Sequence, residues 1–332
     1  MSMMLSKRLL AGAALSVLIG SGAPALAQES SLEEVVVTAN RREENLQQVP
    51  IAITAVTAQS LEKNAALRTS DLSNVVPGLS FTMQINGGTP FMRGIGTPST
   101  TVGNEASVAL YIDDVYIASP NASVFQFNNV DSMAALKGPQ GTLFGRNATG
   151  GVLQVRTRDP GQSPRFDVTG TLANYSTKEG AFYGNVPVTD DVAVNLAAYG
   201  RKQDHGWGRN LTTGEPTFTG WDWGVRAKAL WTPTDATSIL LTADMNKARG
   251  SRGMGLHVLP GAIAADGATT YGGFYNTYGS PNDYSLNKQS GVSLKVSHDL
   301  DAVRLVSITA YRDADSLAQF DQDTTAVPIV DA

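Results

Sequence analysis

Apolar and polar residues alternate from Trp221 to Trp231, except that apolar Leu230 stands at a polar position. Because side chains alternate across a strand, this segment predicts a β-strand with two different faces. A soluble sandwich also alternates, but tryptophan at both ends of the apolar face and charge on the other face are typical of a strand between lipid and a polar interior. The apolar face comprises Trp221, Trp223, Val225, Ala227, Ala229 and Trp231, and the opposite face comprises Asp222, Gly224, Arg226, Lys228 and Leu230.

The same period of two recurs throughout the second half of the chain and predicts seven strands. The strands are expected near 165–175, 179–188, 192–203, 220–232, 236–246, 289–298 and 302–316. The links near 189–190, 233–234 and 299–300 are tight, whereas 204–219 and 247–288 are long and glycine-rich. Tight and long links fall at opposite ends of the strands, with 176–178 as the exception. Bacterial membrane barrels show this arrangement, with short periplasmic turns and longer external loops.

The first half of the chain predicts a mixed α+β domain. A strand is expected at 49–57, helices at 60–67 and 70–75, and a further strand at 79–85. Ser70 is the expected N-cap of the second helix, and Pro77-Gly78 is its stop. A loop follows at 86–103. The segment 109–117 then predicts a hairpin whose turn is Asp113-Asp114, because aspartate favours tight turns and no third catalytic group stands near it.

The N-terminus predicts an exported protein. Lys7 and Arg8 precede a short apolar run, and an A-x-A site ends at Ala27. This pattern indicates a cleaved signal peptide at 1–27, since the apolar run is well short of the roughly 20 residues that a membrane anchor needs. The following segment, 28–48, is polar and predicts a flexible tail. Its valine run could be an edge strand of the domain or a strand that pairs with a partner protein.

Five glycines fall between 136 and 151, in the segment LKGPQGTLFGRNATGG. Glycine reaches positive φ without steric cost, so this segment predicts a series of tight turns rather than a regular helix or strand. A phosphate-binding P-loop is excluded because no Lys-Ser/Thr pair follows Gly145. A dinucleotide fingerprint is excluded because Gly94 and Gly96 lead into no helix.

Composition narrows the possible functions. A net charge of −5 and the lack of a basic cluster argue against nucleic-acid binding. The chain has no cysteine, which excludes a disulfide framework and a thiol nucleophile. His205, His257 and His298 are isolated, so no metal site, catalytic constellation or cofactor is expected.

Three segments resemble TonB-dependent outer-membrane receptors. The glycine run with the following VLQVRTRDP is similar to the plug-domain motif of that family, EEVVVTA resembles a TonB box, and FMRGIG resembles the Arg-Gly segment of the plug. Their order and spacing agree over nearly the whole chain. Two positions depart from the family pattern, namely Ala134, where an acidic residue is frequent, and Gln154, where asparagine is common.

The resemblance implies an α+β plug domain followed by antiparallel transmembrane β-barrel strands. The expected boundaries are 28–48 for the tail, 49–160 for the plug and 161–332 for the N-terminal part of the barrel. The implied TonB-contacting residues are Glu33, Glu34, Val35, Val36, Val37, Thr38 and Ala39. The implied plug-motif residues, which would hold the plug within the barrel, are Arg93, Gly94, Gly96, Leu136, Lys137, Gly138, Pro139, Gln140, Gly141, Gly145, Arg146, Asn147, Gly150 and Gly151.

By the same resemblance, the protein is a receptor rather than an enzyme. It would take up a scarce solute across the outer membrane, with an iron–siderophore complex as the expected cargo. Its expected partners are the TonB protein with the inner-membrane energising complex, outer-membrane lipid and the solute. Solute contacts are expected in 84–101, 119–127, 204–219 and 247–288. A secreted all-β binding or adhesion protein is the alternative from another class.

Seven strands are too few to close a barrel around a plug, which takes about 22 strands. We therefore expect a curved open sheet beside a compact plug. The last residues contain Pro328 and lack the terminal aromatic of family barrels, so we also expect a natural truncation or gene fragment that aggregates or is degraded when expressed alone.

Overall fold

The structure is a computed structural model of the 332-residue chain. It describes residues 36–37, 44–45, 51–64, 66, 68–84, 87–98, 105–119, 129–251, 261–263, 267–268, 270, 272–280, 282–321, 323 and 325–326. The predicted signal peptide, most of the predicted tail and the predicted solute segment 119–127 beyond Ser119 lie outside these residues. Among the described residues, no helix has the length and apolar character needed to cross a membrane.

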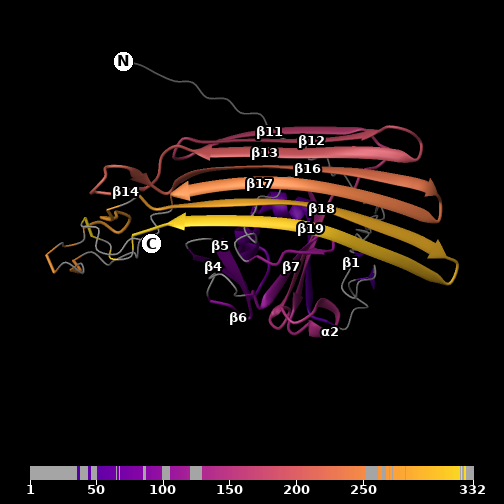
Figure 1. Cartoon of the computed structure of the whole chain (residues 1–332), viewed down its shortest axis with the longest axis horizontal. Coiled ribbons are helices and arrows are strands. Elements are labelled where there is room, and N and C mark those ends of the chain that lie inside the picture. The colour runs from indigo at the N-terminus through magenta and orange to yellow at the C-terminus, as the bar shows by residue number, and fades with distance from the viewer. Residues whose placement is uncertain are drawn as a thin grey trace, which may run out of the picture. The chain divides into compact units, whose positions relative to one another are not determined.

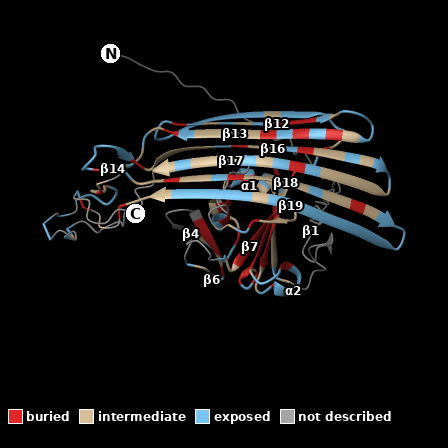
Figure 2. Ribbon diagram, in the orientation of Figure 1, coloured by how far each residue is buried: buried red, intermediate tan, exposed pale blue. Residues whose placement is uncertain are grey.

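The first half forms a mixed domain around a five-stranded sheet. This sheet has the order β3-β9-β10-β7-β8. Its strands are β3 (Ile53–Thr57), β7 (Val108–Ile112), β8 (Val115–Tyr116), β9 (Val130–Lys137) and β10 (Gly151–Thr157). β10 is parallel to β7 and antiparallel to β9. All five residues of β7 are buried, and Figure 2 shows this strand in red.

Apolar packing on both faces of the sheet forms the core of this domain. One cluster includes Leu72, Met92 and Leu153, and the other includes Leu136, Phe144 and Val152. Leu72, Leu136 and Val152 are each 0% exposed. Burial of such side chains stabilises a fold by roughly 1.5–3 kcal/mol each, so this domain holds itself together mainly by apolar packing.

Two helical segments precede the first hairpin. Helix α1 (Ala58–Lys63) begins two residues before the predicted helix, because the Thr57 side chain accepts a hydrogen bond from the Ser60 amide and caps it. The second segment is a 3-10 helix, η2 (Thr69–Asn74), and the predicted cap at Ser70 is wrong. Arg68 is the residue at the cap, and its amide donates to Asp71 instead. Gly78, with φ of 82°, ends the segment where predicted.

The predicted loop at 86–103 is also wrong in part, because two strands lie within it. β4 (Leu79–Gln84), β5 (Gly87–Met92) and β6 (Ile95–Gly96) form a three-stranded sheet. Glycine and proline in β5 are depleted in strands, which explains why the sequence favoured a loop. Pro90 is tolerated because only Phe91 and Met92 of β5 pair with β6.

The second half is a seven-stranded antiparallel meander, as predicted. Neighbours in sequence are neighbours in the sheet, in the order β11-β12-β13-β16-β17-β18-β19 (Figure 1). The strands are β11 (Arg165–Ala173), β12 (Thr177–Pro187), β13 (Val192–Gln203), β16 (Thr219–Thr234), β17 (Thr237–Ser251), β18 (Tyr284–Leu300) and β19 (Val303–Gln319). The sheet is open, with β11 and β19 at its edges. Figure 2 shows both edge strands mostly in pale blue.

The connections confirm the predicted division into two ends. The links between β16 and β17 and between β18 and β19 comprise only 235–236 and 301–302, and we call this end of the sheet the turn end. The longer links 204–218 and 252–283 leave from the opposite end, which we call the loop end. The link 204–218 also contains a small hairpin of β14 (Gly208–Arg209) and β15 (Pro216–Thr217), which was not predicted.

Candidate functional site

The plug-motif residues form a compact turn structure inside the first domain. The glycine run is not made of turns alone: its ends belong to β9 and β10, and its centre is one helical turn, α2 (Gly141–Phe144). The amide of Gly138 donates to the Gly150 carbonyl at 3.1 Å, and the amide of Gln140 donates to the Ala148 carbonyl at 2.7 Å. These bonds close the run into a loop that returns the chain from β9 to β10.

Gly151 is the position where glycine is indispensable in this loop. Its φ is +155°, and a Cβ at this position would lie 2.5 Å from the Leu136 carbonyl oxygen. Any side chain would therefore clash with backbone of the neighbouring strand. The same tight approach occurs at Gly96, where a Cβ would lie 2.4 Å from the Phe91 ring. The Arg-Gly segment thus packs closely on β5.

The motif also makes polar contacts within its own domain. Arg146 pairs with Glu105 at 2.6 Å, and the Asn147 amide donates to the Tyr116 hydroxyl at 2.7 Å. The Tyr111 hydroxyl donates to the Phe144 carbonyl at 3.0 Å. Arg93 has a positive φ of 52°, and its amide donates to the Gly78 carbonyl. Among the described residues, no ion pair joins the motif to the seven-stranded sheet, so its contacts organise the first domain itself.

Instead, the turn of the β7–β8 hairpin joins the first domain to the sheet. Both turn residues have positive φ, Asp113 at 48° and Asp114 at 68°, as the predicted aspartate turn requires. Asp113 Oδ2 lies 3.2 Å from Lys228 Nζ and 3.5 Å from an Arg226 guanidinium nitrogen. Asp114 pairs with Lys295 at 2.6 Å. The turn therefore sits against three basic side chains from β16 and β18.

These basic residues belong to a larger network on the same face of the sheet. The side chain of Lys228 is 0% exposed, and its ammonium group also contacts Asp159 at 2.7 Å and the Thr157 carbonyl at 3.1 Å. Asp244 lies between Arg226, at 3.7 Å, and Arg312, at 2.6 Å. Positive and negative groups alternate through the network, so each buried charge has an opposite charge beside it.

The electrostatics favour an ionised Asp113. Burial by itself would raise the pKa of this carboxyl group. The charges of Lys228 and Arg226 oppose that effect, and Thr157 donates two hydrogen bonds, from its amide at 2.8 Å and its hydroxyl at 2.7 Å. Together they hold the pKa of Asp113 below its ordinary value of 3.8.

Two further contacts join the first domain to the sheet. Arg68, beside η2, pairs with Asp222 of β16 at 2.9 Å. The segment between the two halves is fixed by asparagine side chains that project from the sheet: Asn185 donates to the Gly161 and Ser163 carbonyls, and Asn195 donates to the Arg158 carbonyl at 2.9 Å. We call the side of the sheet that makes these contacts the inner face and the opposite side the outer face.

The inner face carries the residues that the alternation places opposite the tryptophans. Asp222, Arg226 and Lys228 all contact the first domain, which confirms their predicted orientation away from Trp221 and Trp223. The outer face is apolar over most of its length, and no helix or strand of the described residues covers it. Its exposed large side chains include Leu196, Trp223, Trp231, Leu241, Met245, Val292 and Leu294.

An aromatic cluster gathers at the loop end. The Trp207 and Phe218 rings stack with centroids 4.6 Å apart, and Tyr175 and Tyr275 meet Trp207 edge to face. Asn210 ties the two long links together, because its side chain donates to the Gly279 carbonyl at 3.0 Å. Trp207, Tyr175 and Tyr275 are nevertheless 43–47% exposed. The cluster therefore presents aromatic surface at the end of the sheet.

The predicted TonB box lies mostly outside the described residues. Val36 and Val37 form β1, which pairs antiparallel with β2 (Glu44–Asn45). His205 and His298 are strand-end or loop residues near Ser176 and Thr237 hydroxyls, and His257 lies outside the described residues. Within the described part of the chain, no three acidic or histidine side chains gather into a possible metal site.

Sequence reasoning missed the network around Asp113 as a functional feature. It assigned Asp113-Asp114 to a turn and placed Arg226 and Lys228 on a polar face, but it did not connect the two. The available signal was the coincidence of an acidic turn in the first half and a basic stripe on strands of the second half. No pattern in the sequence specifies which strand faces which turn, because that pairing depends on the tertiary arrangement.

Comparison with known proteins agrees with this architecture. Residues 45–152 match the family model described as TonB-dependent Receptor Plug Domain. This part of the chain is a plug domain of the TonB-dependent receptor type. We therefore call the first domain the plug, and the seven strands that follow it match the antiparallel strands of such receptors.

The relatives of this plug-bearing chain are receptors. It is 28% identical over 199 residues to the pesticin receptor of Yersinia pestis, which covers 58% of this chain and 29% of the relative. It is 24% identical over 263 residues to the catecholate siderophore receptor Fiu of Escherichia coli K12, which covers 75% of this chain and 32% of the relative. The chain thus spans about a third of the length of these curated relatives.

A solved structure shows the same fold. The ferric yersiniabactin uptake receptor FyuA from Yersinia pestis superposes with a TM-score of 0.70 and 22% sequence identity. The match covers 82% of this chain and 42% of that chain. It includes both halves, so the plug and the open sheet belong to one shared fold.

Proposed function

We propose that this chain is the plug and N-terminal barrel part of an outer-membrane receptor that takes up iron–siderophore complexes with energy supplied through TonB. The observation that carries the proposal is the contact of the plug with the polar face of the seven-stranded sheet, made by the largely buried pairs of Asp113 with Lys228 and Arg226 and by the half-buried pair of Asp114 with Lys295. A plug held in this way blocks the interior until it moves. The names of the relatives, a catecholate siderophore receptor and a ferric yersiniabactin receptor, support iron chelates as the cargo.

Solute contact falls on the loop end in this proposal. Plug segment 84–101 and loops 119–127, 204–219 and 247–288 would form the binding surface. The exposed aromatic rings of Trp207 and Tyr275 support this assignment, because a rigid, half-apolar ring can stack on an aromatic chelator and add roughly 0.5–1.5 kcal/mol beyond area burial. Binding rather than catalysis is the expected chemistry, and outer-membrane lipid is the expected partner of the apolar outer face.

The TonB contact is assigned to Glu33, Glu34, Val35, Val36, Val37, Thr38 and Ala39. Within the described part of the tail, β1 pairs with the two residues of β2, and a few backbone hydrogen bonds contribute about 1 kcal/mol each. A partner strand could therefore replace β2 at low cost, which is the chemistry of strand addition. Arg93 and the 136–151 loop would keep the plug folded while the box is engaged.

The test is a proline in the box of the receptor encoded by the complete reading frame. Val36→Pro removes a backbone donor and should abolish uptake of iron-loaded catecholate siderophore while leaving its binding to whole cells unchanged. Gln47→Pro, outside the box, is the matched control and should leave uptake unchanged. Uptake by Val36→Pro at the unmodified rate would refute the TonB-box assignment, and absence of binding in the unmodified receptor would refute the cargo.

A further inference from the structure

The side chain of Gln203, the last residue of β13, closes the base of the link 204–218. Gln203 is buried, with an exposed fraction of 8%. Its amide nitrogen donates to the His205 carbonyl at 3.0 Å and to the Phe218 carbonyl at 2.7 Å. These carbonyls stand near the two ends of the link, so the two hydrogens of one amide group hold both ends together.

The bond from Gln203 also fixes a strained backbone in the aromatic cluster. Phe218 has a positive φ of 58°, a conformation that a bulky side chain rarely adopts. Such a conformation persists only where neighbouring contacts hold it. Gln203 binds the Phe218 carbonyl, and the Phe218 ring stacks on Trp207 with centroids 4.6 Å apart. Gln203 therefore helps to set the geometry of the stacked pair at the loop end.

Gln203 is oriented in turn by Arg201, which precedes it by two residues and lies on the same inner face. The Arg201 guanidinium donates to Gln203 Oε1 at 2.7 Å. Because the amide oxygen accepts from this cation, the amide nitrogen of Gln203 must point toward the link. Arg201 therefore determines the orientation of the Gln203 amide.

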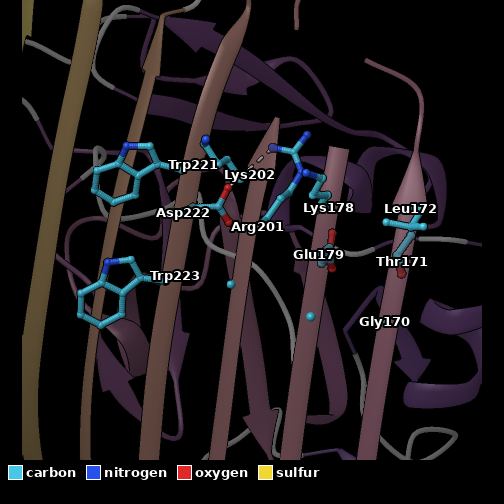
Figure 3. A pocket seen from close by; sticks show the side chains of 12 residues that line it. Gly170, Thr171, Leu172, Lys178, Glu179, Arg201, Lys202, Trp221, Asp222 and Trp223 are labelled. Carbon is cyan, nitrogen blue, oxygen red and sulfur yellow. Dashed lines mark ion pairs between the residues drawn. The ribbon is translucent and has the colours of Figure 1, made fainter. Parts of the chain in front are cut away.

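Arg201 connects Gln203 to the plug through Asp222. Arg201 and Asp222 are directly opposite on β13 and β16, and a guanidinium nitrogen of Arg201 lies 3.7 Å from Asp222 Oδ1 (Figure 3). The same carboxylate oxygen accepts a hydrogen bond from Arg68 of the plug at 2.9 Å. A continuous series of polar contacts thus runs from Arg68 to Gln203 and the aromatic cluster.

This series of contacts depends on the position of the plug. Asp222 has two basic partners among the described residues, and Arg68 is the nearer one. When Arg68 moves away with the plug, the carboxylate keeps Arg201 as its partner and attracts it across a medium of low dielectric constant. Arg201 then approaches Asp222 and withdraws from Gln203. The Gln203 amide is then free to turn away from the Phe218 carbonyl.

We propose that Gln203 is a positioning residue for solute binding, and that it makes the aromatic cluster dependent on the contact between the plug and the sheet. The proposal rests on the proposed function in one respect, namely that the ring of Trp207 contacts the solute. It adds that the cluster is fully formed only while Arg68 pairs with Asp222. Movement of the plug therefore weakens the binding of the solute at the loop end when the passage opens.

The test uses the receptor encoded by the complete reading frame, purified in a nonionic detergent. One readout is the affinity for an iron-loaded catecholate siderophore, and the other, which needs no ligand, is hydrogen exchange of peptides from 205–218. Gln203→Leu removes both hydrogen-bonding groups of the side chain at similar volume. It should lower the affinity about tenfold and accelerate the exchange, since two hydrogen bonds to the link are lost.

Gln289→Leu is the matched control for this change. Gln289 is also a buried glutamine on the inner face, 7% exposed, but it lies on β18. Its replacement should leave both readouts unchanged. Gln203→Glu is the second variant, because it keeps the size and the contact with Arg201 but cannot donate to the two carbonyls. It should behave as Gln203→Leu does.

Arg68→Gln tests the connection to the plug. It should lower the affinity and accelerate exchange in 205–218, although Arg68 lies in the other domain. Lys63→Gln, at an exposed position of the plug, should change neither readout. In the double variant Arg68→Gln/Gln203→Leu the two effects should fall well short of adding, because residues of one network act through the same contacts.

Each contrary result has a distinct meaning. Unchanged affinity and exchange in folded Gln203→Leu or Gln203→Glu overturns the positioning role, and so does an equal change in Gln289→Leu. Additive effects of Arg68→Gln and Gln203→Leu, or no effect of Arg68→Gln, overturn the dependence on the plug. Absence of siderophore binding in the unmodified receptor refutes the cargo of the proposed function, while hydrogen exchange still decides the role of Gln203.

Discussion

The interior of the plug is stabilised by apolar packing, whereas its contact with the sheet is made by ion pairs. The plug core is apolar, with Leu72, Leu136 and Val152 completely buried. The contact with the sheet depends on buried charge, with Lys228 as completely hidden as any core side chain. The hairpin turn nevertheless fits closely, since the cavity between it and the sheet is only about 10 Å³.

This difference shows how the plug can separate from the sheet without unfolding. Apolar core groups have no favourable alternative in water, so separating them costs the full transfer free energy. When an ion pair separates, both ions become hydrated. The net contribution of a buried pair to stability is therefore small compared with its Coulomb energy. The plug is therefore expected to remain folded under conditions that release it from the sheet, which suits a domain that must clear a passage and return.

The largest effect on stability is expected from a substitution in the apolar core of the plug. Leu136→Ala removes a fully buried side chain from the cluster that supports the motif loop. It should lower the free energy of unfolding of the plug by about 4 kcal/mol, as measured by urea denaturation. Leu143→Ala, in the same loop but 41% exposed, is the control and should change stability by less than about 1 kcal/mol. Similar losses in both variants would contradict a core centred on Leu136.

The second-largest effect is expected on the outer face of the sheet, which takes part in neither the plug core nor the ion pairs. Ala227→Arg places a charge at the centre of the apolar band and should cost about 3 kcal/mol in a lipid bilayer. The measurement is reversible unfolding from lipid vesicles. Ala236→Arg, in the tight link at the turn end, should be nearly neutral. If both changes cost the same, the apolar band does not face hydrocarbon.

A smaller effect on stability is expected from breaking an ion pair between the plug and the sheet. Asp113→Asn removes the carboxylate that faces Lys228 and Arg226. Breaking a buried pair costs about 3–5 kcal/mol when a charge is left alone, but Lys228 retains Asp159 and Arg226 retains Asp244. We therefore expect a loss of about 2 kcal/mol, confined to the attachment of the plug. Asp131→Asn, at an exposed position of β9, should have no effect on this attachment.

The same carboxylate predicts a pH dependence. Because the pKa of Asp113 is lowered in the folded chain, its contribution to stability is present above the ordinary value of 3.8 and is lost as the pH falls through the lower folded value. Attachment of the plug, followed by an interdomain fluorescence probe, should weaken below about pH 4. In Asp113→Asn the acid-induced loss should be smaller. An identical acid profile in the two proteins would assign the titration to other carboxylates.

The sequence predicted the sheet better than the plug, for a physical reason. Strands with an apolar outer face show a clear period of two, so all seven were predicted, with 192–203 matching β13 at both ends. Plug strands are buried on both faces or contain glycine and proline. β5 was therefore assigned to a loop, and β9 was not predicted. The Asp113-Asp114 turn was predicted, but its contact with Lys228 depends on residues 115 positions apart in the chain, which no local pattern encodes.

Hydrogen exchange tests the central claim most directly. The unmodified chain and Asp113→Asn would be compared by mass spectrometry at neutral pH, with peptides from β9 and β10 reporting on the core and peptides spanning Asp113 and Thr157 reporting on the attachment. If ion pairs attach a plug that is stable by itself, the variant should exchange faster at the hairpin turn and at Thr157, the last residue of β10, while the amides of β9 and of Val152–Val155 keep their protection. Equal acceleration across all these peptides would contradict the claim, because the ion pairs would then stabilise the plug fold itself.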